Sequence, residues 1–262
     1  MTTWLQRDGV GLHWREDGDP AGAPVVLLNS LGTDLRLWDP VLPALAEYRV
    51  IRMDTRGHGL SDVPAAPYSL AMLTADAAAL VAHLELGRFA IVGVSLGGMI
   101  AQALAAEMPD RTERVILSNT ALRIGTPEMW ADRIDAVQTG SLDGIADAVL
   151  ERWFAPAFRA QSGNGLWRNM LTRTPAAGYA GCCAALAAAD LTATAKEISC
   201  PALVIGGSDD GATPPAIVRE LAAAIPHAEY VEIDGAGHLP MAETPDRFAD
   251  LSGTFLKEPV RA

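Results

Sequence analysis

The chain has 262 residues, half of them hydrophobic and a fifth charged, and its 20 Lys and Arg against 32 Asp and Glu give a net charge of −12. This length suits one large domain or a domain with an insertion, and the composition is that of a globular protein. The strong negative charge repels phosphate backbones and anionic lipids, so nucleic acids and membrane surfaces are not expected partners.

The sequence does not predict a membrane-spanning segment, a signal peptide, a disulfide framework or a zinc site. No apolar run reaches the roughly 18 residues of a membrane-spanning helix, and the N-terminus lacks the basic-then-apolar profile of a signal peptide. The number of cysteines is odd and no Cys-x-x-Cys spacing occurs, which argues against a disulfide framework and a zinc site. The cysteines are Cys182, Cys183 and Cys200. We expect a cytoplasmic enzyme.

Strand-like runs recur along the chain. The segments "TWLQRD" and "GLHWRED" near the N-terminus predict an antiparallel hairpin at one edge of a sheet. Six apolar runs follow, and most are nearly continuous, as in strands that are buried on both faces of a mostly parallel sheet. The runs span residues 24–29, 48–53, 89–94, 114–119, 201–206 and 228–234.

Helical patterns separate most of these runs. Alternating strands and helices predict an α/β protein in which helices flank the sheet. The helical segments span residues 34–46, 70–86, 96–108, 215–225 and 245–257.

The alternation stops between residues 121 and 190, where no strong strand occurs. We expect residues 121–190 to form a helical cap, inserted into a core made of residues 1–120 and 191–262. An insertion at this place can lie over the carboxyl ends of the strands, where ligands bind in such sheets. The expected breaks between its helices are at Gly140, Gly163 and Gly178.

The pentapeptide Gly93-Val94-Ser95-Leu96-Gly97 directly follows one of the apolar runs. Its pattern, Gly-x-Ser-x-Gly, describes a sharp strand-to-helix turn that holds a serine hydroxyl out of the backbone. An ordinary glycine-rich turn that contains a serine would have the same pattern. The two alternatives can be separated only by residues elsewhere in the chain. Serine needs a nearby base, usually a histidine that a carboxylate holds in one tautomer.

The partners of such a serine follow it in the order acid, then histidine. His238 lies in a glycine-flanked loop just past the last predicted strand, whereas His227 lies at the opposite end of the sheet. Asp209 and Asp210 follow the preceding strand, and the Gly-x-x-Asp pattern favours Asp210, with Asp209 as the alternative. We therefore predict a catalytic triad of Ser95, Asp210 and His238.

A tetrahedral oxyanion needs two backbone N–H donors. We expect one from Leu96, the residue after the predicted nucleophile, and the other from Leu31 in the loop "NSLGTD". The sequence contains no His-Glu-x-x-His, no P-loop ending and no Gly-x-Gly-x-x-Gly, so neither a metal nor a nucleotide cofactor is expected.

The segment "MDTRGHGLSD" (53–62) could also be catalytic, since it holds His58 together with several carboxylates and hydroxyls. We interpret it as a structural loop, in which glycines allow a tight turn and Arg56 pairs with Asp54 and Asp62. The two remaining histidines, His13 and His83, are interpreted as surface positions.

With these motifs in place, the chain resembles the α/β-hydrolase fold family over essentially its whole length. The likeness rests on the turn at Ser95 and on "DTRGHGLSD", "GGSDDGATPP" and "GAGHLPMAETP". One branch is more similar, the 3-oxoadipate enol-lactonases, through "NSLGTDLRLWDP" and the cap segments "SNTALRIGTPEMWADRI", "LERWFAPAF" and "GYAGCCAALAAADL". The resemblance implies an α/β-hydrolase fold, with a mostly parallel eight-stranded sheet, and a serine hydrolase that uses no cofactor.

The same resemblance implies a substrate. It is 3-oxoadipate enol-lactone, hydrolysed to 3-oxoadipate through an acyl-enzyme in the β-ketoadipate pathway of aromatic degradation. Because the lactone carries an acetate arm, we expect a cation in the pocket of this acidic protein. Arg133 is the candidate, with Arg152 and Arg123 as alternatives, and Trp130 and Trp153 are candidates for the pocket lining.

Two other readings stay open. "HLPMAETP" looks like the histidine loop of general esterases and peroxidase-like hydrolases, so the same triad could serve a general carboxylesterase or lactonase, or a cofactor-free perhydrolase. A non-catalytic small-molecule receptor on the same fold could also keep the triad. Steady turnover of an activated ester that is lost in Ser95→Ala would separate an enzyme from a receptor.

Overall fold

The computed structural model describes residues 3–161 and 165–258. Eight strands of these residues form one sheet in the order β1-β2-β4-β3-β5-β6-β7-β8. The pairs β1–β2 and β2–β4 are antiparallel and the other neighbours are parallel. The predicted hairpin and mostly parallel eight-stranded sheet are confirmed. The strands are β1 Trp4–Arg7, β2 Val10–Gly18, β3 Pro24–Leu28, β4 Arg49–Met53, β5 Phe89–Val94, β6 Thr112–Ser118, β7 Ala202–Gly207 and β8 Glu229–Ile233.

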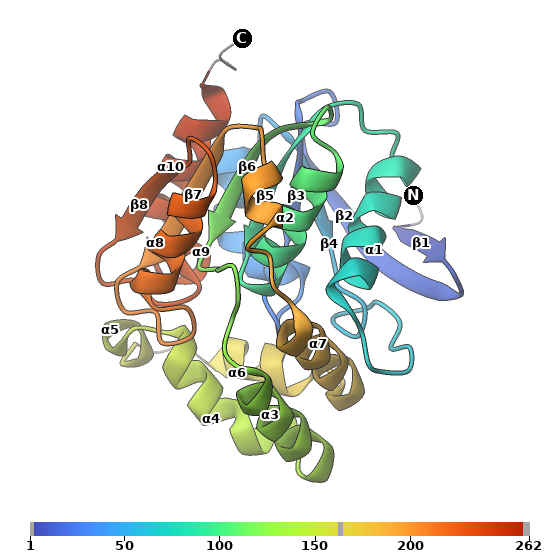
Figure 1. Ribbon diagram of the computed structural model, residues 1–262, viewed down its shortest axis with the longest axis vertical. Coiled ribbons are helices and arrows are strands. Elements are labelled where there is room, and N and C mark those ends of the chain that lie inside the picture. Colours follow the sequence, from blue (N-terminus) through green and yellow to red (C-terminus); the bar gives the residue numbers. More distant parts are fainter. Residues whose placement is uncertain (1–2, 162–164, 259–262) are drawn as a thin grey trace.

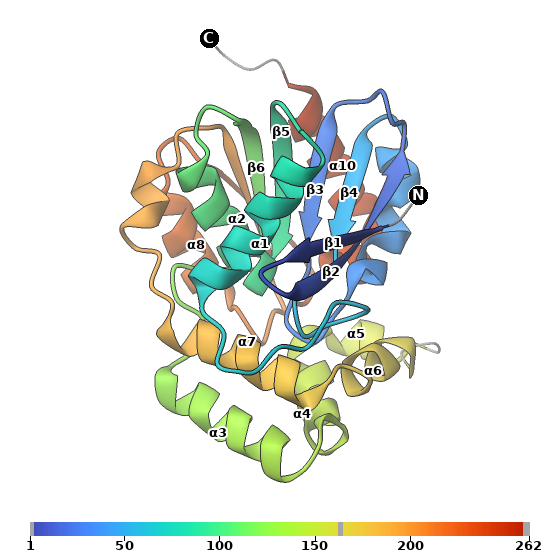
Figure 2. The same ribbon diagram turned by 90° about the vertical axis from the view of Figure 1, so that its right-hand side faces the viewer.

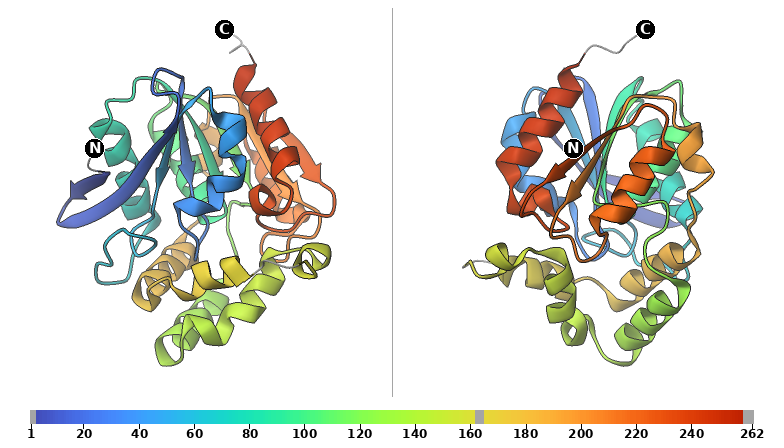
Figure 3. Two further views of the ribbon diagram at one scale, coloured as in Figure 1. Left: turned by 180° about the vertical axis from the view of Figure 1, so that it is seen from behind. Right: turned by 60° about the vertical axis from the view of Figure 1, so that its left-hand side comes forward.

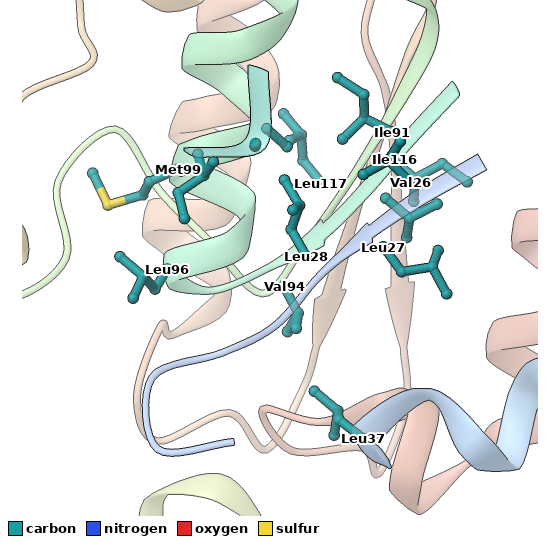
Figure 4. Close-up of a cluster of buried hydrophobic side chains, with 14 of the residues drawn as sticks. Val26, Leu27, Leu28, Leu37, Ile91, Val94, Leu96, Met99, Ile116 and Leu117 are labelled. Atoms are coloured by element: carbon teal, nitrogen blue, oxygen red, sulfur yellow. The ribbon is translucent and has the colours of Figure 1, made fainter. Parts of the chain in front are cut away.

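The centre of the sheet is buried on both faces, as its apolar runs predict. Every residue of β5 and of β7 is buried. Val26, Ile91 and Ile116, on three adjacent strands, pack together in this core (Figure 4). A parallel sheet is stable only when helices cover both of its faces.

Helices provide that cover. Helices α1 (Leu70–His83), α2 (Leu96–Glu107) and α8 (Pro215–Ala224) lie on one face, and the 3₁₀ helix η1 (Leu35–Leu45) and α10 (Pro245–Lys257) on the other (Figures 1 and 3). η1 contains two prolines, Pro40 and Pro43. Because proline lacks an N–H and clashes with the preceding turn, these residues disfavour a regular α-helix here. The short helices η2 (Thr194–Glu197) and α9 (Pro240–Glu243) complete the core.

Helices α3 to α7 lie between β6 and η2 in the chain, and we call them the inserted helices. They lie beyond the carboxyl ends of the parallel strands (Figures 1 and 2). The division of the chain into a core and a cap stays a prediction. No helix of the described ranges has the length and apolar character needed to cross a bilayer. The inserted helices are α3 Pro127–Thr139, α4 Leu142–Trp153, α5 Pro156–Arg159, α6 Gly165–Thr172 and α7 Ala176–Ala188.

The glycines expected to separate these helices have different roles. Gly140 follows the last residue of α3, as predicted, and Gly163 lies outside the described residues. The prediction for Gly178 is wrong, because this residue lies inside α7. A Cβ atom on Gly178 would lie 2.4 Å from the Cα of Gly57. Glycine is needed here because the helix backbone packs directly on a core loop.

Candidate active site

Ser95 lies at the turn between β5 and α2, with φ 56° and ψ −118°. The flanking glycines are required sterically. A Cβ atom on Gly93 would lie 2.3 Å from the carbonyl oxygen of Gly97, and one on Gly97 would lie 2.1 Å from that of Leu28. The hydroxyl of Thr120 donates a hydrogen bond to the Ser95 carbonyl at 2.8 Å. The surrounding structure therefore holds the serine in a backbone conformation that a side chain rarely adopts.

Asp210 follows β7 and is 4% exposed. Its Oδ2 atom accepts hydrogen bonds from His238 Nδ1 at 2.8 Å, from the Thr213 hydroxyl at 2.6 Å and from Asn119 Nδ2 at 2.8 Å. Its Oδ1 atom accepts from the backbone N–H groups of Ala212 and Thr213. Burial raises the pKa of Asp210, but His238 and the hydrogen bonds outweigh burial and hold the pKa below its usual range.

His238 lies in the loop between β8 and α9 and is 1% exposed. Its backbone N–H donates to the carbonyl of Trp153 at 2.7 Å. A charged Asp210 favours the tautomer with a proton on Nδ1, which leaves Nε2 able to accept one. The pair can therefore act as an oriented base.

Ser95 and His238 line the same pocket, together with Ser30 and Leu31. The free volume of this pocket is small, about 40 Å³. No hydrogen bond within the described ranges joins the Ser95 hydroxyl to His238. Such bonds between nucleophile and base often tighten only when substrate binds. The structure thus brings the three residues predicted as a triad to one place.

Leu31 lies in the loop after β3 and lines the same pocket as Ser95. Leu96 directly follows Ser95 and is the first residue of α2. Within the described part of the chain, neither backbone N–H donates to a protein acceptor. The Leu31 loop is held by the next residue, since the N–H of Gly32 donates to His58 Nε2 at 2.9 Å. Burial lowers the pKa of His58, so its ring is neutral and can accept this bond. Both N–H groups are available to an oxyanion.

The loop of residues 53–62 makes structural contacts, as interpreted, but the partners predicted for Arg56 are wrong. Arg56 donates two hydrogen bonds of 2.6 Å to Asp76, which lies on α1. Asp54 instead accepts from backbone N–H groups and from His13 Nδ1 at 2.7 Å. The surface interpretation of His13 is wrong too, because its side chain is only 14% exposed. Asp76 lies outside the loop and is the better partner, because both of its carboxylate oxygens accept hydrogen bonds from the guanidinium.

The other aspartate and histidines considered from the sequence do not line the pocket at Ser95. Asp209 is exposed beside Asp210 and does not bond to a histidine in the described residues. His227 is exposed in the turn before β8, at the opposite end of the sheet, as predicted. His83 is exposed on α1, where its ring contacts Trp14 edge-on.

Two arginines of the inserted helices line the pocket, Arg133 on α3 and Arg152 on α4. Arg133 donates to the Tyr179 hydroxyl at 3.2 Å, and Arg152 donates to the carbonyl of Gly211 at 3.0 Å. Neither forms an ion pair with an acidic side chain among the residues described. Burial and the charge of Arg133 lower the pKa of Arg152.

The third arginine considered from the sequence, Arg123, is not a pocket residue. It pairs with Asp190 on the surface, and its side chain is 66% exposed. Trp130 and Trp153 do line the pocket and are buried, so their indoles form its apolar wall.

Sequence reasoning missed four residues of the site. Tyr179 lines the pocket, and burial raises its pKa to about 12. Ser30 lines it too, and its buried hydroxyl has no hydrogen-bond partner among the described residues. Asn119 donates both to Asp210 and to the carbonyl of Gly237. Glu243 accepts from the N–H of Gly237. Asn119 could have been found, because it lies just past the buried strand β6, as Asp210 lies just past β7.

A larger cavity of about 520 Å³ lies at the edge near β2, lined by His13, Arg15, Asp54 and neighbouring residues. It holds none of the predicted site residues, and volume alone does not supply a nucleophile. Among the described residues, no group of three His, Cys, Asp or Glu side chains could hold a metal ion. The narrow pocket at Ser95 is therefore the candidate active site.

Known proteins are similar to this chain over most of its length. The model of the alpha/beta hydrolase family matches residues 25–251. The chain is 36% identical to 3-oxoadipate enol-lactonase 2 of Acinetobacter baylyi, covering 93% of this chain and 92% of that protein. The structure of the enol-lactonase from Burkholderia xenovorans LB400 matches with 43% identity and a TM-score of 0.94, covering 97% of this chain and all of that one.

An esterase is also similar. The thermophilic esterase from Thermogutta terrifontis, solved with malate bound, matches with 30% identity and a TM-score of 0.89, covering 97% of this chain and 96% of that one. The resemblance inferred from the motifs is confirmed by these matches. The chain belongs to the alpha/beta hydrolase family and is a hydrolase.

Proposed function

We propose that this hydrolase opens 3-oxoadipate enol-lactone to 3-oxoadipate, with Ser95, His238 and Asp210 as its catalytic triad. One observation carries the choice of an anionic lactone. Arg133 and Arg152 line the pocket of Ser95 without an acidic partner among the described residues, although the chain has a net charge of −12. Cations that lie partly buried without a counter-ion are costly, and a bound carboxylate offsets that cost. The likeness to two enol-lactonases supports the same substrate.

The first half of the reaction forms an acyl-enzyme. The Ser95 oxygen attacks the lactone carbonyl while His238 Nε2 takes its proton. The N–H groups of Leu31 and Leu96 stabilise the negative charge on the carbonyl oxygen. The carbonyl–oxygen bond of the ring then breaks, and the ring oxygen leaves as an enolate, to which His238 returns the proton.

The leaving group makes this step easier than ordinary ester cleavage. An enolate is a weaker base than a simple alkoxide and therefore departs more readily. The enol then becomes a ketone, which removes the nucleophile that could close the ring again. In the second half, His238 deprotonates a water molecule that attacks the acyl-enzyme, and Ser95 recovers its proton. The sum is lactone plus water giving 3-oxoadipate.

The first test follows the ultraviolet loss of the enol-lactone, generated in the cuvette, beside hydrolysis of p-nitrophenyl acetate. We expect wild type to prefer the lactone and Ser95→Ala to lose both activities, by about 10⁴-fold or more, because the triad acts as a unit. Turnover of both substrates by Ser95→Ala at rates close to those of wild type would overturn the nucleophile assignment.

Recognition of the carboxylate is tested separately with Arg133→Met. We expect the KM for the lactone to rise by about 10-fold or more, equivalent to a charge-assisted hydrogen bond, while p-nitrophenyl acetate hydrolysis is unchanged. Arg123→Met is the matched control, since Arg123 pairs with Asp190 on the surface. Equal effects of the two variants would contradict a pocket role for Arg133.

The similar esterase makes a general carboxylesterase the second candidate. It predicts serine-dependent turnover of p-nitrophenyl acetate without turnover of the lactone. That result would keep the triad and discard the substrate.

A further inference from the structure

One short segment at the end of α4 connects the inserted helices to both loops of the proposed triad. The backbone of Arg152 accepts a hydrogen bond from the N–H of Gly211, next to Asp210, at 3.1 Å. The carbonyl of Trp153 accepts from the N–H of His238 at 2.7 Å. The side chains of Arg152 and Trp153 line the pocket. Residues that would touch the substrate are therefore bonded directly to the loops that would perform the chemistry.

The carboxylate of Glu243, on α9, completes this junction. Its Oε1 atom accepts from the N–H of Gly237 at 2.9 Å, and its Oε2 atom accepts from the N–H of Ala155 at 2.9 Å. Gly237 precedes His238, and Ala155 is two residues after Trp153. One side chain thus joins the histidine loop to the segment that accepts the His238 N–H.

The bridge depends on both carboxylate oxygens being acceptors. A protonated carboxyl has one hydroxyl that donates, so it cannot accept equally well from two N–H groups that face it. A side-chain amide has the same shape but only one acceptor oxygen. The carbonyl of Gly237 is held on its other side by Asn119, at 3.0 Å, so the loop is bonded from two directions.

We propose that Glu243 is a positioning residue for His238, and that its ionised form holds the histidine loop against the α4 segment during catalysis. This inference rests on the proposed function, because it assumes that His238 is the base. Glu243 acts through the backbone of its neighbours and touches neither substrate nor the reacting atoms.

Glu243 titrates in the range where the enzyme would work. Burial raises its pKa to about 7, although the N–H groups of Ala155, Gly237 and Leu239 act against this, and the charge of Asp210 adds to the rise. The segments joined at this junction also carry Asp210, His238 and Arg152, whereas the remaining ionisable residues of α4 are exposed, namely Asp143, Asp147 and Glu151. As the pH falls through about 7, Glu243 gains a proton and the bridge weakens.

The test compares pH profiles of kcat/KM for p-nitrophenyl acetate in wild type, Glu243→Gln and Ala155→Pro. In wild type we expect the ionisation of Glu243 to appear on the acid side as a second ionisation, beside that of the triad, so that activity falls more steeply than with one. Glu243→Gln should lose the second ionisation and lower kcat at pH 8 about 10-fold, as for one charge-assisted hydrogen bond.

Ala155→Pro keeps the Glu243 carboxyl but removes one of its donors. The backbone of Ala155, with φ −57° and ψ 148°, suits proline, and Phe154 before it is extended. Losing a donor to the carboxylate moves its pKa upward, so the second ionisation should shift to higher pH in this variant. Glu113→Gln is the control, since Glu113 pairs with Arg88 on the surface at 3.0 Å.

The outcomes separate the two proposals. Loss of the second ionisation in Glu243→Gln, with its upward shift in Ala155→Pro, supports the bridge. A serine-dependent wild-type activity whose pH profile is the same in Glu243→Gln overturns it. If Glu243→Gln does not fold, an unshifted profile in Ala155→Pro overturns it as well. Activity that persists in Ser95→Ala would instead mean that the proposed function fails.

Discussion

The pocket at Ser95 has two walls that are built differently. On the side of the loops after β7 and β8, Asp210 and His238 are almost fully buried, and five hydrogen bonds reach the Asp210 carboxylate. On the side of the inserted helices, Arg133 and Arg152 are only partly buried, and each donates to one neutral oxygen. One wall is fixed by its hydrogen bonds, and the other presents unneutralised charge.

The difference separates two tasks. A base must be held within a small distance and angle of the atom it deprotonates, and saturated hydrogen bonds provide this. A site that recognises a carboxylate needs hydrogen-bond donors that acidic groups of the protein leave free for the ligand. We therefore expect substitutions on the loop wall to change kcat and substitutions on the helix wall to change KM.

Among substitutions on the two walls, the largest effect is expected for Asp210→Asn. An amide in this place presents a donor to His238 Nδ1 and favours the wrong tautomer, so kcat for p-nitrophenyl acetate should fall by about 10³- to 10⁴-fold. Asp209→Asn is the matched control, because Asp209 is exposed and adjacent in sequence. It should change kcat by no more than about twofold, as for a surface substitution. Comparable losses in both variants would argue against the assignment of Asp210.

A smaller effect is expected for Arg152→Met on the helix wall. The KM for the anionic lactone should rise about 10-fold while kcat stays within about threefold, because a charged contact to the bound substrate is lost. Steady-state kinetics on the lactone checks this. Comparison with Arg133→Met shows which arginine contributes more to binding, and a fall in kcat without a rise in KM would contradict the separation of the two walls.

The smallest effect concerns stability at the junction of the two walls. The pKa of Glu243 is raised from 4.5 to about 7, so its protonated form is favoured in the fold. Its contribution to stability is fully present below pH 4.5 and is lost as the pH rises through 7. Allowing for partial exposure, this amounts to roughly 1–2 kcal/mol. Between pH 5 and pH 8, the Tm of Glu243→Gln relative to wild type should therefore rise by a few degrees, which calorimetry can measure. A constant difference would contradict the raised pKa.

Much of the fold could be predicted from local patterns. Burial on both faces of the sheet requires continuous apolar runs, so β3 to β7 lie where those runs predict. The edge strand β8 is only partly buried, yet it too lies at its predicted place. The Gly93 and Gly97 positions leave no room for a Cβ atom, which is why the motif around Ser95 is specific. Asp210 and His238 could be predicted because polar residues just past buried strands lie at one edge of a parallel sheet.

Contacts between distant segments could not be predicted in this way. Arg56 has acidic residues close by in sequence, yet it pairs with Asp76 on another element. The role of Glu243 depends on N–H groups from two loops that meet only in the folded chain. The sequence does not separate Arg123 from Arg133. Only the structure shows that Arg123 pairs with the carboxylate of Asp190, whereas Arg133 lines the pocket and has no acidic partner among the described residues.

The contact between Gly57 and Gly178 limits how this enzyme can be redesigned. The core loop and helix α7 meet there backbone to backbone, and a Cβ atom on either residue would lie 2.4 Å from the Cα of the other. A chimaera that takes its inserted helices from a relative must therefore bring a glycine to each side of this contact. Without both glycines, the grafted helices would be displaced by about the width of a methyl group, and the new pocket would no longer be aligned with Ser95.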